Sequence, residues 1–250
     1  MKNNASGFKL NEKKISLASR KKILSSFLKV LQVCLKKEDY KKIRKVKTWQ
    51  DQKLHDVLIN LRIEDKDRFS LIYDLMQKNI CLNFFCNSNK LPNLAANFLG
   101  IKNDEMMMTS QFRMDTPSDQ RNIYDWHQDS AYDKLNSIPS NGVILWMPMI
   151  NTNKKNGTIV IKPKSQNEKN VYKIKKKWKK FVSPQLTVPT SYLKKYRSKD
   201  VSVKTGDCLA MYPNLFHKSG NNTSKQIRFT ILARFNKILT KDFTIFGNRI

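Results

Sequence analysis

The chain has 250 residues and carries 48 lysines and arginines against 20 aspartates and glutamates, which gives a formal net charge of +28. Its length permits one domain with a sizeable core, and we expect neither a transmembrane segment nor a signal peptide from its apolar patterning. Four cysteines, at positions 34, 81, 86 and 208, follow no disulfide or metal-binding spacing. These features exclude a disulfide-rich secreted protein and predict a cytoplasmic one.

Apolar residues recur at helical spacing before residue 105. Residues 20–36 carry one stripe, formed by Leu24, Phe27, Leu28, Leu31 and Leu35. A second stripe consists of Phe69, Ile72, Tyr73, Met76 and Ile80. Residues 92–99 read as a short helix that Pro92 opens and Gly100 closes. We therefore predict residues 1–105 as an α-helical N-terminal region whose apolar faces pack against the structure that follows.

From residue 106 onward the pattern changes to short strands separated by turns. Alternating or apolar runs occupy residues 106–114, 142–149, 158–162, 201–204, 208–212 and 227–235. Turn signals between them include Asn156-Gly157 and Gly206-Asp207. Short strands without long intervening helices predict a mainly β fold with flanking helices, namely an antiparallel double-stranded β-helix, or cupin-like jelly roll. We assign it to residues 106–250, with a basic insert at about 164–200, in a single domain with the helical region.

Two of the three histidines belong to a metal-binding pattern. The sequence has His127-Gln128-Asp129 and then His217, ninety positions after His127. In a β-strand the side chains at i and i+2 share a face, so His127 and Asp129 can reach one metal together. Two imidazoles and one carboxylate form the facial triad of non-haem Fe(II) oxygenases, which leaves coordination positions open. A lone H-x-D tripeptide is common, and the surrounding residues therefore matter.

Those surrounding residues supply an ordered series of motifs. They are the block Trp126-His127-Gln128-Asp129 with Tyr132, the segment Trp146-Met147-Pro148-Met149, the pairs Asn156-Gly157 and Gly206-Asp207, the H-x-S-x-x-N run from His217 to Asn222, and Arg228. In this order and spacing the chain resembles the phytanoyl-CoA dioxygenase family of Fe(II)/2-oxoglutarate-dependent oxygenases over roughly residues 106 to 235. The resemblance implies Fe(II) as cofactor, with 2-oxoglutarate and O₂ as co-substrates. It also implies decarboxylation of 2-oxoglutarate to succinate and hydroxylation of a C–H bond.

The resemblance assigns roles to residues of this chain. His127, Asp129 and His217 are the expected catalytic metal ligands, and Arg228 is the expected partner of the distal carboxylate of 2-oxoglutarate. Arginine suits that role because its planar fork binds a carboxylate bidentately and keeps its charge. Residues 227–235 place Arg228, Thr230 and Arg234 on one face, opposite an apolar face. The predicted cofactor-binding residues are Arg228, Gln111, Arg113 and Thr230.

Three residues flank the predicted ligands. Trp126, Gln128 and Tyr132 are candidates for substrate binding or for orienting the imidazoles, while core packing is the alternative for Trp126. Many family members have a Gly-Ser-His tripeptide where this chain has Lys164-Ser165-Gln166, which retains only the serine. Related halogenases have a small residue at the position of Asp129. The aspartate therefore favours hydroxylation or another oxidative outcome over halogenation.

The high positive charge allows two further interpretations. Basic stretches run from Lys162 to Lys180 and from Lys194 to Lys204. Lysine and arginine neutralise phosphates, so a basic nucleic-acid-binding protein on a non-catalytic oxygenase scaffold is the alternative function. Aromatic residues in these stretches are too sparse for a stacking platform. If the basic insert does not bind nucleic acid, we expect it to cover the pocket, to attract an anionic substrate, or to be a solvated loop. The expected substrate is a small anionic or carrier-linked molecule, such as an acyl-CoA, a carrier-protein thioester or a nucleotide-linked sugar.

Overall fold

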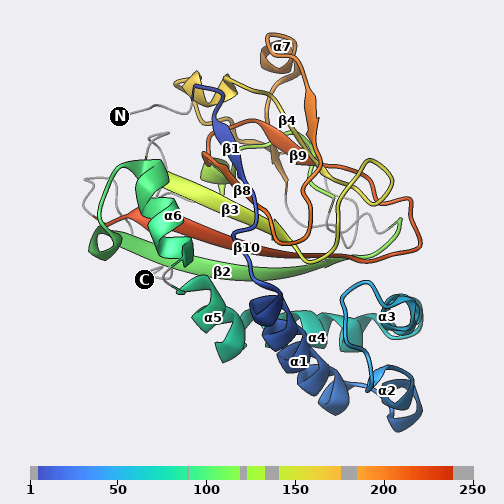
Figure 1. Ribbon diagram of the computed structural model, residues 1–250. Helices are drawn as coiled ribbons and strands as arrows, with labels where there is room; N and C mark the ends of the chain where they lie inside the picture. The colour runs from blue at the N-terminus through green and yellow to red at the C-terminus, as the bar shows by residue number, and fades with distance from the viewer. Residues whose placement is uncertain (1–4, 89, 119–122, 133–140, 176–184, 239–250) are drawn as a thin grey trace, which may run out of the picture.

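The computed structural model describes residues 5–88, 90–118, 123–132, 141–175 and 185–238. Within these ranges, helices gather against one side of a five-stranded sheet, and a smaller sheet lies on the other side (Figure 1). The two sheets form the predicted jelly roll, so the mainly β class with an N-terminal helical region is confirmed. None of the helices in the described part of the chain is long and apolar enough to cross a bilayer.

The helical layer contains both predicted apolar stripes. Its helices are α1 (Leu17–Cys34), α2 (Lys37–Ile43), α3 (Gln52–Glu64), α4 (Lys66–Gln77), α5 (Ile80–Cys86) and α6 (Lys90–Leu99). Ser16 caps α1 by accepting a hydrogen bond from the Ser19 amide. Ile80 departs from its stripe and is 71% exposed, because Asn79 ends the helical repeat and caps α5. Gly100 ends α6 at φ +69°, as predicted, but α6 begins at Lys90, so Pro92 is its third residue and does not open it.

The larger sheet has the strand order β1-β8-β3-β10-β2, and all of its neighbouring strands are antiparallel. Its strands are β1 (Phe8–Asn11), β2 (Met106–Asp115), β3 (Gly142–Pro148), β8 (Cys208–Met211) and β10 (Arg228–Lys237). The smaller sheet has the order β7-β4-β9, formed by Lys199–Val201, Ile159–Ile161 and His217–Ser219. The insert adds the pair β5 (Ile174–Lys175) and β6 (Leu186–Thr187) and the short helix α7 (Thr190–Leu193).

Strands β1, β7 and β9 differ from the sequence prediction. Strand β9, which carries His217, lies outside all the predicted strand runs. Strand β1 lies inside the region assigned to helices and pairs with β8, where Phe8 faces Met211. Four residues are too few to show a period, and the partner strand lies about 200 positions away. Strand β7 ends at Val201 rather than covering residues 201–204. Val203 is bonded instead to Thr152 in a neighbouring loop, which ends the pairing with β4.

The core that joins helices to the larger sheet is aromatic. Phe27 and Trp49 from the helical layer contact Phe112 of β2 and Phe229 of β10, and the Trp49 and Phe229 rings are 5.0 Å apart. At the sheet edge, the Gln77 amide of α4 bonds the backbone N–H and C=O of Phe112. This pairing occupies backbone groups that an edge strand would otherwise expose. The helical layer therefore fixes one face of β10 and leaves the other face to the site.

Candidate metal centre and co-substrate cavity

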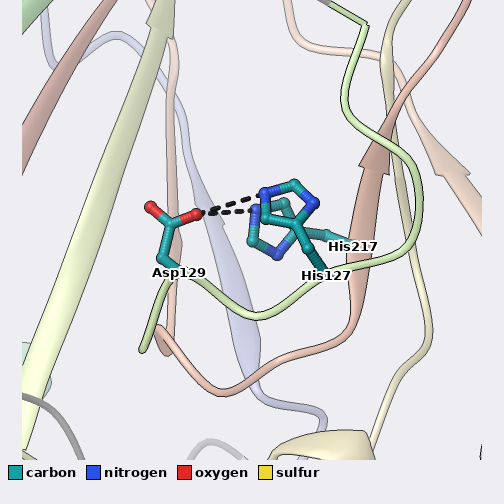
Figure 2. A group of neighbouring side chains, drawn as sticks. All are labelled: His127, Asp129 and His217. Atoms are coloured by element: carbon teal, nitrogen blue, oxygen red, sulfur yellow. Dashed lines mark ion pairs between the residues drawn. The ribbon is translucent and has the colours of Figure 1, made fainter. Parts of the chain in front are cut away.

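The three predicted ligands meet between the two sheets (Figure 2). His217 lies on β9, and His127 forms an isolated antiparallel bridge with it through backbone hydrogen bonds of 2.9 and 3.1 Å. Asp129 begins a 3₁₀ turn, Asp129–Ala131, instead of continuing a strand. The turn brings its carboxylate back towards both imidazoles. The pattern H-x-D thus reaches one site through a bridge followed by a turn, which differs from the expected strand edge.

The donor atoms are arranged as a metal site requires. Asp129 Oδ1 lies 3.3 Å from Nε2 of His127 and 3.3 Å from Nε2 of His217. Each Nδ1 faces a backbone carbonyl, that of Asp125 at 2.7 Å and that of Leu215 at 2.8 Å. Nδ1 therefore donates, and both Nε2 lone pairs point at the shared position. Ligands at right angles and about 2.1 Å from a metal are about 3 Å apart, so this donor set fits a divalent ion.

The electrostatics of the triad favour the metal-binding protonation states. Burial and the neighbouring His217 lower the pKa of His127, which keeps its imidazole neutral. Burial alone would raise the pKa of Asp129, but Arg234 and the two neighbouring histidines hold it well below its ordinary value. The site therefore presents a neutral His127 imidazole and an ionised Asp129 carboxylate at neutral pH. These are the forms in which such groups bind metals.

Arg228 lies at the start of β10 and is 4% exposed. Its Nε and Nη2 donate to Asp115 Oδ2 at 3.2 and 2.8 Å, while Nη2 of Arg113 donates to Asp115 Oδ1 at 3.0 Å. Burial acts to raise the pKa of Asp115, but the two guanidinium groups outweigh it and lower that pKa. Two arginines thus share one carboxylate. Among the described residues, two guanidinium groups and one carboxylate make up this buried cluster.

A cavity of about 480 Å³ connects the triad with this cluster. His127, Asp129 and His217 line one part, and Arg113 and Arg228 line another. Further wall residues are Gln111, Tyr124, Tyr132, Trp146 and Arg234, with Tyr73 and Gln77 contributed by helix α4. The jelly roll therefore brings together the predicted ligands with Arg228, Arg113, Gln111 and Tyr132 around one space.

The family model described as phytanoyl-CoA dioxygenase (PhyH) matches residues 36–230, which is more than half of the chain. The chain belongs to the phytanoyl-CoA dioxygenase family. Members of this family are Fe(II)/2-oxoglutarate-dependent oxygenases, a class of oxidoreductases, and the His127–Asp129–His217 cluster is the corresponding 2-His-1-carboxylate site. The resemblance inferred from the sequence motifs is therefore confirmed. Among curated proteins, no sequence match was found.

Solved structures show the same fold at low sequence identity. The epimerase SnoN, in complex with Fe³⁺, α-ketoglutarate and nogalamycin RO, matches with a TM-score of 0.57 and 11% identity over 93% of this chain and 80% of its own. The non-haem monooxygenase ThoJ matches with a TM-score of 0.51 and 15% identity over 93% and 75%. EvdO2 from Micromonospora carbonacea var. aurantiaca matches with a TM-score of 0.50 and 16% identity over 64% of this chain. The match covers 65% of EvdO2, so this chain spans less than two thirds of its length.

Three predicted site residues of this family member lie away from the cavity wall. Gln128 is fully buried, and its amide bonds the backbone of Asn170, Tyr172 and Asn214. The ammonium groups of two lysines, Lys162 and Lys218, lie 4.8 and 5.1 Å from the centre of the Trp126 ring. Thr230 is buried, and its hydroxyl has no hydrogen bond among the described residues. Gln128 thus anchors the loops on both sides of the triad.

The sequence interpretation missed two charged residues that pair with predicted site residues, Arg234 and Asp115. Arg234 donates through Nε to Asp129 Oδ2 at 2.8 Å and through Nη1 to Gln111 Oε1 at 3.1 Å. Asp115 joins Arg113 and Arg228, as described above. The alternation of β10 did place Arg234 on the polar face with Arg228, but it gave no partner. Asp115 ends β2, and only the β2–β10 register, in which it faces Arg228, reveals its role.

Two motif residues hold the loops beside the ligands. The Ser165 hydroxyl donates to the Lys162 carbonyl and accepts from the Phe216 amide at 2.8 Å, directly before His217. Ser165 therefore retains a structural role although the flanking glycine and histidine of the family are absent. Gly157 has φ +80°, and a Cβ there would lie 2.5 Å from the Gly220 carbonyl oxygen and 2.9 Å from Arg228 Nη1. Only glycine fits this position without displacing Arg228 or the neighbouring backbone.

Proposed function

We propose that the protein is an Fe(II)/2-oxoglutarate-dependent dioxygenase that hydroxylates a C–H bond of a small molecule. The observation that carries the proposal is the triad, in which both Nε2 atoms and Asp129 Oδ1 converge while both Nδ1 protons are held by backbone carbonyls. Iron bound there would use O₂ and 2-oxoglutarate to supply the oxidising power, with release of succinate and CO₂. Three ligands on one face leave room for both co-substrates.

The arginine cluster supports the assignment of the co-substrate. Arg113 and Arg228 share the single carboxylate of Asp115, and a buried excess charge is costly unless a counterion balances it. The distal carboxylate of 2-oxoglutarate supplies that counterion in this proposal. Arg228 holds it directly, and Arg113 contributes to the field. Gln111 on β2 lines the cavity and is a further candidate contact for the co-substrate, whereas Thr230 on β10 is buried and does not line it.

Hydroxylation is the proposed outcome because Asp129 fills the third ligand position. The fold alone does not choose the outcome, since SnoN is described as an epimerase. Two aromatic rings lie beside the triad: those of Tyr124 and Tyr132 are 5.2 and 5.9 Å from the His127 ring. Tyr132 is further held because its hydroxyl accepts a hydrogen bond from the Leu186 amide at 2.7 Å. Transfer of one ¹⁸O atom from ¹⁸O₂ to the product, as well as to succinate, distinguishes hydroxylation from epimerisation.

The substrate of the proposed reaction is a small anionic or carrier-linked molecule, with acyl-CoA, carrier-protein thioesters and nucleotide-linked sugars as the candidate classes. Tyr132 is the predicted substrate contact that lines the cavity, while Trp126 and Gln128 would act through the loops that they hold. We include a cytoplasmic location in the proposal. Its support is the free state of all four cysteines, with burial raising the pKa of the Cys86 thiol to about 12.

The metal assignment is tested by the visible charge-transfer band of a chelated keto acid. Anaerobic Fe(II) with 2-oxoglutarate should give this band in the wild type. His127→Ala, Asp129→Ala and His217→Ala should each abolish it, whereas Asp56→Ala, an exposed carboxylate on α3, should keep it. Circular dichroism of each variant reports whether the fold is retained. A band of unchanged intensity in the three ligand variants would show that iron binds elsewhere.

A further inference from the structure

Arg234 is placed to bind a second anion beside the metal. It lines the cavity, and its side chain is 24% exposed. Nε is used by Asp129 Oδ2 and Nη1 by Gln111, while Nη2 has no hydrogen-bond acceptor within the part of the chain that the structure describes. The guanidinium therefore has one unused edge. Because arginine donors are fixed in one plane, an unused edge favours a carboxylate or phosphate as its partner.

The charges around the cavity leave this arginine without a full counterion. Three arginines line the cavity, and among the described residues two carboxylates bond them, Asp115 and Asp129. Binding of Fe(II) and of the 2-oxoglutarate dianion adds equal and opposite charges. Counted over the part of the chain that the structure describes, the excess of one positive charge therefore remains after both have bound. Lys218, which also borders the cavity, increases the excess. The excess belongs to Arg234, because the distal carboxylate balances the cluster around Asp115.

We propose that the substrate carries a carboxylate or a phosphate that binds Arg234, an inference that rests on the proposed function. Arg234 also holds the oxygen of Asp129 that faces away from both imidazoles, so the anion lies close to the metal. The oxidised carbon is therefore only a few bonds from the charged group. This geometry selects small free acids and phosphate esters. It disfavours acyl-CoA and carrier-linked substrates, whose charges lie far from the acyl carbons.

Matched pairs of charged and neutral probes test this inference and do not require the native substrate. The anaerobic Fe(II)·2-oxoglutarate complex is titrated with 3-phenylpropionate and 3-phenylpropanamide, and then with phenyl phosphate and phenol. Binding is followed through the charge-transfer band and through the thermal midpoint. We expect each anion to bind about tenfold or more tightly than its neutral counterpart, because a charge-assisted hydrogen bond contributes that much.

Variants locate the anion. Arg234→Gln should reduce the preference for anions to below about threefold, while Arg234→Lys, which keeps a cation and serves if the glutamine variant misfolds, should retain part of it. Arg44→Gln, an exposed arginine after α2, is the matched control and should behave as the wild type. Equal binding of acid and amide by the wild type, or an undiminished preference in Arg234→Gln, would overturn the inference. Absence of the charge-transfer band in the wild type would instead contradict the proposed function.

Discussion

Each of the two carboxylates of the site uses its two oxygens for different partners. Asp129 offers Oδ1 to the imidazoles and Oδ2 to Arg234, and Asp115 offers one oxygen to Arg113 and the other to Arg228. Burial acts to lower the pKa of Arg113, but Asp115 outweighs it, so the pKa is raised and the guanidinium stays charged. Each carboxylate thereby fixes the direction of an arginine that faces the cavity. Such fixed donors need little reorganisation when an anion binds.

Replacement of Arg228 separates the two co-ligands of the site. Arg228→Ala should weaken 2-oxoglutarate binding by about 2 to 5 kcal/mol, or roughly 30-fold to several thousand-fold, because the distal carboxylate loses its buried partner. The Fe(II) requirement should change far less, since Arg228 bonds no metal ligand. The measurement is the intensity of the charge-transfer band. 2-Oxoglutarate is titrated at saturating Fe(II), and Fe(II) is then titrated at saturating 2-oxoglutarate. Equal weakening of both titrations would assign Arg228 to another role.

Helix α3 is tied to strand β10 by the third histidine of the chain. His55 is fully buried, and its Nδ1 accepts a hydrogen bond from the Ile227 amide at 2.9 Å, one residue before Arg228. Its ring also lies 5.5 Å from that of Phe229. Burial lowers the pKa of His55 to about 4 from the ordinary value of 6.5. The contact therefore requires the neutral ring, and it connects the helical layer to the co-substrate arginine.

The stability of this contact should depend on pH. His55 binds a proton below about pH 6.5 in the unfolded chain but only below about pH 4 in the folded chain. The stability that the neutral ring contributes is therefore fully present above about pH 6.5 and is lost as the pH falls towards 4. The shift corresponds to about 3 kcal/mol. Urea unfolding at pH 7.5 and 4.5 should show a larger loss in the wild type than in His55→Gln, which keeps an acceptor but does not titrate. An equal loss in both proteins would remove His55 as the cause.

At the scale of the whole molecule, a chain of high positive charge adopts the fold of the phytanoyl-CoA dioxygenase family. The formal net charge is +28. The described part of the insert lies on the side of the jelly roll away from the helical layer (Figure 1), and it contacts the triad loops through Tyr172 and Leu186. Lys173 and Lys175 are exposed there, whereas Lys176, Lys177, Lys179 and Lys180 lie outside the described residues. Attraction of an anion towards the cavity therefore stays a prediction for the insert.

Charge reversal tests that role. The double variant Lys173→Glu and Lys175→Glu should slow succinate release stimulated by the tightest-binding anionic probe, and the wild-type rate should fall with salt, because exposed charges are screened within about 8 Å at physiological ionic strength. Lys37→Glu with Lys41→Glu on α2 makes the same change of net charge on the helical layer and should have little effect. If both double variants respond alike, the insert acts only through net charge. Tight binding of random duplex DNA without iron affinity would favour the nucleic-acid alternative.

The sequence by itself determined the ligand set and four of the five strands of the larger sheet, β2, β3, β8 and β10. Ligand chemistry restricts the metal site to few residue types, and the strand periods of residues 106–114 and 227–235 follow directly from alternation, so His127, Asp129, His217 and the face of Arg228 were predictable. The tertiary structure decided which carboxylates pair with the three arginines. The antiparallel register of β2 and β10 places Asp115, and the 3₁₀ turn places Asp129. Strand β1 and the role of His55 also required the tertiary structure, since each depends on contacts between residues more than 170 positions apart. Local patterns encode periodicity and residue chemistry, but the pairing of distant charges is set only when the two sheets close around the site.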